Sequence, residues 1–464
     1  NSAFALGNLL TQGAINAIEL NGDEAQKQFW LPRLIDGTWA GTMNLTEPPA
    51  GSNLGAIKTM AKPEGDHYRI SGQKIFITYG DHELTENIVH LVLARTPDAP
   101  AGTRGLSLFV VPKFVPNDDG SLGERNDITC VSLEHKMGIH GSPTAVLNYG
   151  DNGGAVGYLV GEEDRGLQYM FTMMNDARFE VGLQGLGIAD GAYQHARAYA
   201  GDRKQGVPVG HATETTIDHH PDVRRMLMNM QARVVAMRCL GYFAASLRDR
   251  AHFSPDEAAR TQADEEYNYL IPIVKGWMTE TCQQVAYDGL QVHGGWGFIE
   301  EMGAAQFVRD ARITTLYEGT TGIQAADLAF RKTAHDQGEV AQRLLERLSG
   351  IAATADDNGP ALSAAVAAAK GYVDWLTQEA KAEPAQLAAS SDTYLRAMGT
   401  LVGGALLERS AQMAREKRAG SSFADARTAL ARHFVASLLP EAQVQFETAA
   451  AAAGPVAEYD PAWL

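Results

Sequence analysis

One residue that could do chemistry in this sequence is Glu318, within "RITTLYEGTTGIQAADLAFRK". It stands between an apolar run and a Gly/Thr turn that opens a helical pattern. A positioned glutamate can take a proton from a bound substrate. An acid at the positive end of a helix, beside Thr320 as the N-cap, would be stabilised there without any catalytic role. The local pattern by itself favours capping.

A glycine-rich stretch, "QVHGGWGFIEE" at 291–301, ends a long helical pattern. Gly294 and Gly295 would cap that helix if they adopt left-handed conformations. Two adjacent glycines would equally let the backbone approach a pyrophosphate, because no side chain stands in the way. The two interpretations have the same weight. His293 in this stretch is more typical of a satisfied structural histidine than of a catalyst or ligand.

Two earlier stretches, "MNLTEPPAGSN" at 43–53 and "KIFITYG" at 74–80, could contact a flat polar ligand. The first offers hydroxyls and approachable backbone amides, although its Pro and Gly residues more often only form turns. In the second, Phe76 and Thr78 alternate on one strand face and could present a ring and a hydroxyl to the same ligand. A half-buried strand explains the second stretch better when it is taken alone.

Several arginines are candidates for binding phosphate in an otherwise acidic chain. They are Arg178 in "NDARFE", Arg203 in "GDRKQG", and Arg224 and Arg225 in "HHPDVRRML". Each is usually a solvated or ion-paired helix residue, but some could bind the phosphates of an anionic cofactor. The sequence has no P-loop, no dinucleotide-fold fingerprint, and no zinc-protease or serine-hydrolase motif.

The composition is that of a soluble globular protein of two or three domains, with 464 residues, 45% hydrophobic and 20% charged. A net charge of -17 makes the average surface repel nucleic acid and anionic membranes. No apolar run is long enough for a membrane span, and nothing marks export. Cys130, Cys239 and Cys282 show neither zinc-site nor disulfide spacing, so we expect thiols in a reducing cytoplasm and no metal site.

Four segments of different periodicity must position these candidates. Residues 1–38 are helical, 39–162 form a β domain, 163–335 form a helical bundle, and 336–464 form an added Ala-rich helical domain. In the bundle we expect helices near 166–201, 222–251, 262–291 and 320–334. The added domain should break at "DDNGPA" and near "RAGSSF". The predicted fold class is multidomain α+β.

Taken together and in order, the motifs make the chain similar to the acyl-CoA dehydrogenase family. They are "LTEPPAGSN", "GQKIFIT", "DRKQG", "QVHGGWGF" and "VRDARITTLYEGTTGIQ". The resemblance implies N-terminal helices, a central β-barrel-like domain and a C-terminal four-helix bundle, with the isoalloxazine of FAD between the β domain and the C-terminal helices. Only residues 1–38 correspond to the family's N-terminal helical domain, so one wall of the active site is expected to lie outside this sequence.

The resemblance also implies contacts for individual residues. Those that would hold FAD are Met43, Leu45, Thr46, Ser52, Phe76, Ile77, Thr78, Arg203, His220, Gln291, Gly294, Gly295, Thr320 and Gly322. Those that would contact the acyl-CoA substrate are Ser52, Asn175, Arg178 and Gly319. Thr78 would donate toward flavin N5. Arg203, Gln291 and the paired glycines would reach the FAD of a partner subunit, which predicts a homodimer.

The catalytic base implied by the resemblance is Glu318. Members of the family carry the base either in the "YEG" motif or on the helix that here carries Ala177, and alanine cannot accept a proton. Glu318 would take the α proton of an acyl-CoA thioester while the β hydrogen leaves as hydride to flavin N5. The Glu318 N–H and a ribityl hydroxyl of FAD would polarise the thioester carbonyl.

Within the family, the segments at 76–114, 134–178 and 219–227, together with the added domain, resemble the branch that acts on 3-methylmercaptopropionyl-CoA in dimethylsulfoniopropionate breakdown. This predicts that substrate, with electron-transfer flavoprotein as the acceptor. The alternatives are a dehydrogenase of broad short- and medium-chain or long-chain acyl-CoA specificity, an acyl-CoA oxidase that passes electrons to O₂, and a flavin-containing relative that binds DNA under stress. The acidic charge argues against the last.

Overall fold

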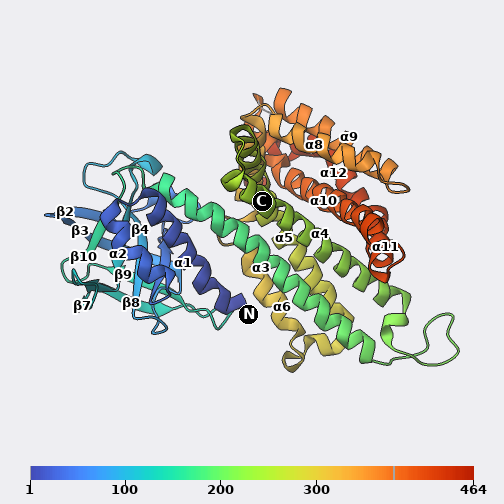
Figure 1. Ribbon diagram of the computed structural model, residues 1–464, viewed down its shortest axis with the longest axis horizontal. Coiled ribbons are helices and arrows are strands. Elements are labelled where there is room, and N and C mark those ends of the chain that lie inside the picture. Colours follow the sequence, from blue (N-terminus) through green and yellow to red (C-terminus); the bar gives the residue numbers. More distant parts are fainter. Residues whose placement is uncertain (1, 380–381, 464) are drawn as a thin grey trace. The chain divides into compact units, whose positions relative to one another are not determined.

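The computed structural model describes residues 2–379 and 382–463, which form two compact units, Asn1–Glu180 and Val181–Leu464 (Figure 1). The chain is an α+β protein, as predicted, with a curled sheet in the first unit and a helical second unit. Helix α3 (Gly166–Asp202) begins in the first unit and continues in the second. Across the described ranges, no helix has the length and apolar character needed to cross a membrane.

The first unit packs α1 (Ser2–Asn21) and α2 (Glu24–Ile35) against the sheet. Its strands are β1 (Trp39–Asn44), β2 (Met60–Glu64), β3 (His67–Thr78), β4 (Asn87–Ala94), β5 (Ser107–Pro112), β6 (Phe114–Pro116), β7 (Leu122–Arg125), β8 (Ile128–Leu133), β9 (Thr144–Tyr149) and β10 (Ala155–Val160). The main sheet has the order β1-β4-β5-β10-β3-β9-β8, and β2 pairs with β3. β1 and β4 are parallel, whereas β6 and β7 form a separate pair.

Two strands, β4 and β5, are buried along their whole length because both faces of the sheet are covered. On one face, Leu91 belongs to an apolar cluster that includes Trp30 of α2. On the other face, Val92 and Phe109 belong to a second apolar cluster. A shift of one residue would move each side chain to the wrong cluster, so this burial fixes the register of the strands.

The core of the first unit contains one buried imidazole, that of His90 on β4. Its Nδ1 lies 2.7 Å from the Thr42 hydroxyl. Asn44 Nδ2 donates to the same hydroxyl, and the Tyr149 hydroxyl donates to Asn44 Oδ1. Burial lowers the pKa of His90 from its ordinary 6.5 to about 3. The imidazole is therefore neutral in the folded protein.

We expect the first unit to lose stability as the pH falls from 6.5 toward 3, because the unfolded chain then binds a proton that folded His90 does not bind. At pH 5 the loss due to His90 should be about 2 kcal/mol. Urea unfolding at pH 7 and pH 5 measures this loss. The pH dependence should shrink by that amount in His90→Gln, and an unchanged dependence in the variant would contradict the prediction.

The second unit is a helical bundle followed by the added helical region. Beyond α3 its helices are α4 (Pro221–Phe253), α5 (Glu257–Val292), α6 (Ala304–Arg312), α7 (Thr321–Ala326), α8 (Glu339–Ala353), α9 (Gly359–Gln378), α10 (Pro384–Lys417), α11 (Ser422–Ser437) and α12 (Leu439–Glu458). Helix α5 begins before the predicted residue 262, because Asp256 accepts a hydrogen bond from the Ala258 N–H and caps it there. Both predicted breaks are confirmed, between α8 and α9 and between α10 and α11.

The helix expected at 320–334 is only partly confirmed. Its first part is α7, but Asp327–Ala334 is π-helical. The Thr333 hydroxyl donates at 2.8 Å to the carbonyl oxygen of Leu328, five residues earlier. The Gly338 N–H bonds to the Thr333 carbonyl with the same spacing. Apolar periodicity over so few residues does not distinguish this wider turn from an α-helix.

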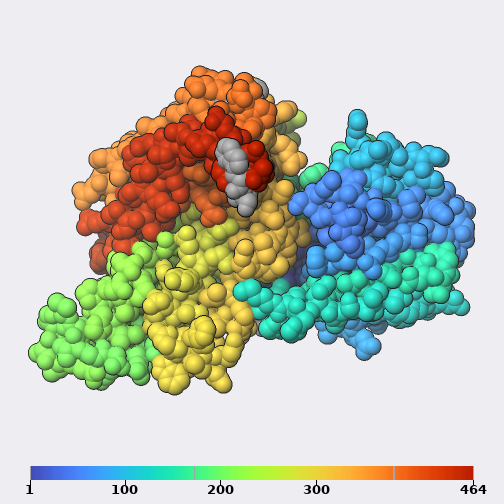
Figure 2. Space-filling view, turned by 180° about the vertical axis from the view of Figure 1, so that it is seen from behind, coloured from blue at the N-terminus to red at the C-terminus, as the bar shows by residue number. Residues whose placement is uncertain are grey.

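The added helical region, residues 336–464, packs on the bundle mainly through α10. Figure 2 shows its orange and red atoms lying on the yellow and gold atoms of the bundle. Trp277 of α5 lies against Gly399 and Gly403, where a Cβ atom would come within 2.2 and 2.7 Å of the tryptophan side chain. Only glycine lets α10 approach α5 this closely.

Candidate active site

Glu318 lies in a tight turn between the short helix Ile313–Thr315 and α7. Its φ of 55° and the 88° of Gly319 put two successive residues in the left-handed region. For a non-glycine residue this conformation costs about 1–3 kcal/mol and persists only where the surroundings impose it. Glu318 is half-buried. The chain therefore holds this glutamate in a specific, unfavourable backbone geometry.

Two buried side chains hold the carbonyl groups of the turn. Lys275 of α5 donates from Nζ to the Gly319 carbonyl oxygen at 2.6 Å. Gln324 Nε2 donates to the carbonyl oxygens of Glu318 and Gly319 at 3.1 and 3.3 Å. The ammonium of Lys275 thus fixes the residue that follows Glu318, and the amide of Gln324 fixes both.

Tyr317, the residue before Glu318, anchors the other side of the turn. Its hydroxyl donates to Gln184 Oε1 on α3. Burial and the charge of Glu318 raise the pKa of Tyr317 far above its ordinary value. The phenol therefore stays neutral and remains a hydrogen-bond donor at any working pH.

Thr320, rather than Glu318, provides the N-cap of α7. Its hydroxyl accepts a hydrogen bond from the Ile323 N–H at 3.4 Å, as predicted. Thr321 then secures the first residue of the helix by donating to Glu280 Oε1 at 2.7 Å. Because α7 is capped by these threonines, capping does not explain why a glutamate is held two residues before the cap.

Of the glycine pair at the end of α5, Gly294 adopts the left-handed conformation expected of a cap and Gly295 does not. Gly294 is left-handed, with a φ of 59°, and follows the last residues of the helix. A Cβ atom at Gly294 or at Gly295 would meet nothing within 4 Å. Gln291 is exposed in the last turn of the same helix. This helix end is open backbone to which an anionic group has access.

His293 is a buried structural histidine, as its sequence context suggested, but among the described residues only one of its ring nitrogens has a hydrogen-bond partner. It is buried and stacks on Tyr199, with ring centroids 4.4 Å apart, and its Nδ1 lies 2.7 Å from the Gly289 carbonyl oxygen. Within the described chain, however, Nε2 has no hydrogen-bond partner. The expectation of a fully satisfied histidine is wrong for this nitrogen.

The structure separates the arginines into different environments. Arg203 is exposed and donates to Gln205 Oε1, while His220 Nε2 bonds the backbone carbonyl of the same Gln205 at 3.0 Å. These two predicted cofactor contacts therefore share one loop. Arg225 pairs with Asp222 at the start of α4, as a surface residue would. Arg178 is only 3% exposed on α3, so a solvated position is excluded for it.

In the first unit, Phe76 has an unusual position on β3. It lies at a bulge between Lys74 and Ile77, has a φ of 61°, and keeps 59% of its surface exposed. Ile77 is buried and Thr78 is half-buried, so Phe76 and Thr78 are both more accessible than the residue between them. A half-buried strand alone does not explain an exposed ring on a left-handed backbone.

A buried ion pair joins β3 to the loop that follows β1. Lys74 Nζ lies 2.9 Å from Glu47 Oε1 and donates to the Leu45 carbonyl oxygen at 2.9 Å. Glu47 also accepts hydrogen bonds from the Lys58 N–H and the Thr59 hydroxyl. Burial lowers the pKa of Lys74 to about 8. Burial also acts to raise the pKa of Glu47. The charge of Lys74 and these hydrogen bonds outweigh that effect, so the pKa of Glu47 stays below its usual value.

Sequence reasoning missed three charged residues that organise these turns: Glu47, Lys74 and Lys275. By strand alternation Lys74 belongs with Phe76 and Thr78, and only the bulge explains why it is buried. Lys275 stands alone in the apolar run "LIPIVKGWM" of α5, and a single charge in such a run was an available signal.

The residues that the resemblance assigned to FAD fit such a group within each unit taken by itself. In the first unit, the exposed ring of Phe76 and the hydroxyl of Thr78 suit a flat polar ring. In the second, open glycine backbone and an exposed arginine suit phosphates. Of the other residues assigned to FAD or to the acyl-CoA, Leu45 and Ile77 are buried, Met43, Thr46 and Asn175 are half-buried, and Ser52, Thr320 and Gly322 are exposed. Among the described residues no three His, Cys, Asp or Glu side chains could together hold a metal ion.

Three protein-family models match the chain. The model described as acyl-CoA dehydrogenase, middle domain, matches residues 42–151, and the one described as acyl-CoA dehydrogenase, C-terminal domain, matches residues 164–332. A third, described as acetyl-CoA dehydrogenase C-terminal like, matches residues 332–460. The matched ranges cover the β domain, the bundle and the added region.

Two curated relatives and one solved structure illustrate the similarity. The chain is 48% identical to 3-methylmercaptopropionyl-CoA dehydrogenase of Ruegeria pomeroyi, over 96% of this chain and 77% of the relative. It is 37% identical to a butyryl-CoA dehydrogenase of Syntrophomonas wolfei, over 93% and 74%. An acyl-CoA dehydrogenase from Bacillus anthracis, solved with FAD, aligns with a TM-score of 0.74 at 23% identity, over 96% of this chain and 74% of that one.

Proposed function

Because the chain belongs to the acyl-CoA dehydrogenase family, we propose that it oxidises 3-methylmercaptopropionyl-CoA to the trans-2-enoyl-CoA, with Glu318 as the base. The family activity, dehydrogenation of an acyl-CoA thioester with FAD, agrees with the names of the curated relatives that match most of the chain. The narrower substrate is supported by the relative that is 48% identical over 96% of the chain. The assignment of Glu318 rests on the constrained left-handed turn that presents it.

Glu318 removes the proton from the α carbon of the thioester. The β hydrogen leaves with its electron pair, so that a double bond forms between the α and β carbons. FAD, when bound, accepts that hydride. The α proton becomes acidic only when the thioester carbonyl is polarised, and we assign the Glu318 N–H as one donor to that oxygen. Lys275 and Gln324 hold the adjoining carbonyls and so set the orientation of the peptide groups of the turn.

The residues proposed to bind FAD are the individual positions named in the sequence. They lie between Met43 and Thr78 in the first unit and between Arg203 and Gly322 in the second. Phe76 would lie beside the ring system and Thr78 would donate a hydrogen bond to it. The open backbone at Gly294 and Gly295 would accept a phosphate group. Asn175, Arg178, Ser52 and Gly319 are proposed to contact the acyl-CoA.

Flavin bleaching with a panel of acyl-CoA thioesters tests the proposed substrate. We expect the FAD-loaded protein to be reduced faster, at lower concentration, by 3-methylmercaptopropionyl-CoA than by butyryl-CoA or octanoyl-CoA. The matched comparison is butyryl-CoA, the substrate named for the 37% identical relative. A strong preference for long acyl chains would refute the narrow assignment, and bleaching by none of the thioesters would refute the dehydrogenase function itself.

We propose electron-transfer flavoprotein as the acceptor of the electrons, as the family membership suggests. Hydrogen peroxide formed in step with turnover would instead indicate an acyl-CoA oxidase.

Nucleic acid is not proposed as a partner, because a net charge of -17 disfavours binding to phosphate backbones. A cytoplasmic location is proposed because Cys130, Cys239 and Cys282 are free thiols, as is usual in a reducing compartment.

A homodimer is proposed from the apolar surface near the end of α5. Tyr287, Trp296 and Phe298 are large side chains that remain exposed there, beside the open glycine pair. Exposed apolar surface of this kind commonly marks protein–protein contacts, and two-fold dimers are the commonest oligomers. Arg203, Gln291, Gly294 and Gly295 would then complete the FAD site of the second copy.

A further inference from the structure

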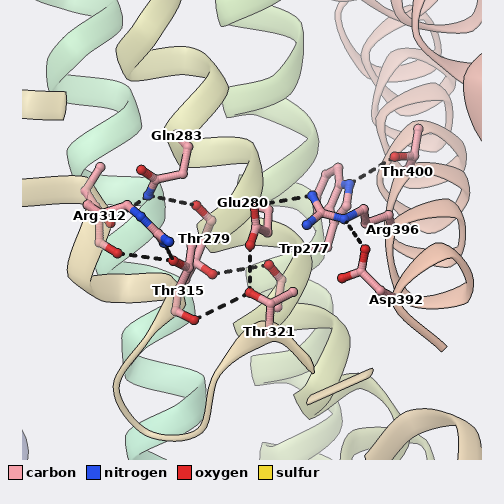
Figure 3. A network of polar contacts seen from close by, with 12 residues as sticks. Trp277, Thr279, Glu280, Gln283, Arg312, Thr315, Thr321, Asp392, Arg396 and Thr400 are labelled. Carbon is pink, nitrogen blue, oxygen red and sulfur yellow. Dashed lines mark hydrogen bonds and ion pairs between the residues drawn. The ribbon is translucent and has the colours of Figure 1, made fainter. Parts of the chain in front are cut away.

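The second unit contains a chain of polar contacts that runs from the added helical region to the turn holding Glu318. It begins at Arg396 on α10, whose Nε donates to Asp392 Oδ2 at 2.7 Å and whose Nη1 lies 3.3 Å from Glu280 Oε2 on α5. Glu280 uses its other oxygen to accept the Thr321 hydroxyl at 2.7 Å (Figure 3). Each oxygen of one carboxylate therefore contacts a different structural element.

Thr321 connects this chain of contacts to the Glu318 turn. Thr321 is the first residue of α7 and lies three residues after Glu318. Its hydroxyl is buried and has Glu280 Oε1 as its close acceptor, with the Thr315 carbonyl oxygen farther away at 3.5 Å. Displacing Glu280 would loosen the start of α7. The Glu318 turn, which depends on the surrounding structure for its left-handed geometry, would then relax.

The same part of α5 contacts the turn on one side and α10 on the other. Lys275 donates to the Gly319 carbonyl, and the next residue, Gly276, leaves room for Leu395 of α10. Trp277 donates from Nε1 to the Thr400 hydroxyl at 3.0 Å (Figure 3). These contacts join α10 to the turn through residues 275–280 of α5.

We propose that Arg396 is a positioning residue for the catalytic turn: it orients Glu280, which holds Thr321 and through it the geometry of Glu318. The added helical region then contributes to catalysis without touching the substrate. The inference rests on the proposed role of Glu318 as the base.

Arg396→Ala should lower kcat by about 10- to 100-fold, because a displacement of about 1 Å at a catalytic group is enough for such a loss. The KM for the acyl-CoA and the flavin absorbance should change little. Arg396→Lys, which keeps a cation near Glu280, should recover part of the rate. The matched control is Arg409→Ala, an arginine of the same helix that contacts Gln412 and Glu416, and it should behave like the wild type.

A double-mutant cycle separates this role from general stabilisation. If Arg396 acts through Glu280, the kcat of the double variant Arg396→Ala with Glu280→Ala should equal that of Glu280→Ala alone. Losses that multiply independently would overturn the proposal. It would also be overturned if Arg396→Ala loses flavin or melting temperature while its kcat per bound flavin stays at the wild-type value.

Hydrogen–deuterium exchange gives a readout that does not depend on activity. The amides of residues 313–323 should exchange faster in Arg396→Ala than in the wild type, and those of α9 should not change. Unchanged exchange at 313–323 would overturn the proposal. If the wild type oxidises no acyl-CoA, the proposed function fails, and this exchange comparison still decides whether α10 holds the turn.

Discussion

Glu318→Gln is expected to bind FAD like the wild type and to lose at least about 10²-fold in the rate of flavin reduction by the acyl-CoA. Glutamine has nearly the same shape, so the left-handed turn and its bonds to Gln324 and Lys275 should persist. What the amide cannot do is accept the α proton. Stopped-flow absorbance of the flavin measures the rate, and the flavin-to-protein ratio shows whether the cofactor is retained.

A matched substitution of an exposed glutamate, Glu301→Gln, tests whether charge alone matters. It changes the net charge by the same amount and should leave the rate of flavin reduction unchanged. A Glu318→Gln variant with near-wild-type reduction would show that another group removes the proton. Ala177, at the position that the resemblance gives as the alternative, cannot be that group.

Lys74→Met is expected to destabilise the first unit by about 3–5 kcal/mol, the usual cost of removing one partner of a buried ion pair. Glu47 would keep its hydrogen bonds from Lys58 and Thr59 but would lose its counter-ion in a site that is nearly closed to water. The Leu45 carbonyl would lose its donor as well. Because Leu45 belongs to the loop proposed to contact FAD, weaker flavin retention should accompany the loss of stability.

Urea unfolding of Lys74→Met, followed through hydrogen exchange of β3 peptides, reports on the first unit alone. Lys62→Met is the control, because Lys62 lies exposed on the neighbouring strand β2 and its loss should cost little. Adding Glu47→Leu to Lys74→Met should recover part of the stability, since the unpaired charge is then removed. If Lys74→Met is as stable as Lys62→Met, the ion pair of Lys74 and Glu47 is not needed to hold the loop.

The sequence was sufficient for those parts of the fold that depend on long, regular patterns. The long helices of the bundle and the buried strands β4 and β5 were predictable because their apolar spacing persists over many residues. Asp327–Ala334 was not, because a π-helix differs from an α-helix in hydrogen-bond spacing and hardly in which residues are apolar.

At the candidate site, Glu318 could be identified from an ordered set of motifs. The residues that hold its turn could not all be identified in this way. Thr320 could be predicted as a cap, because capping depends on residues three apart. The contacts of Lys275 and Glu280 join residues more than forty positions apart in sequence, and no local pattern encodes them. The burial of Lys74 could not be predicted, because a bulge changes the side of the strand on which this side chain lies.

The π-helical segment Asp327–Ala334 has a consequence for exchanging parts between related enzymes. It connects α7 to the region that begins with α8, and its Thr333 is within 3.1 Å of the Tyr394 hydroxyl on α10. A graft that removed one residue here would change the five-residue spacing of the segment's hydrogen bonds and would move Thr333 relative to Tyr394, so fusion points belong after residue 338.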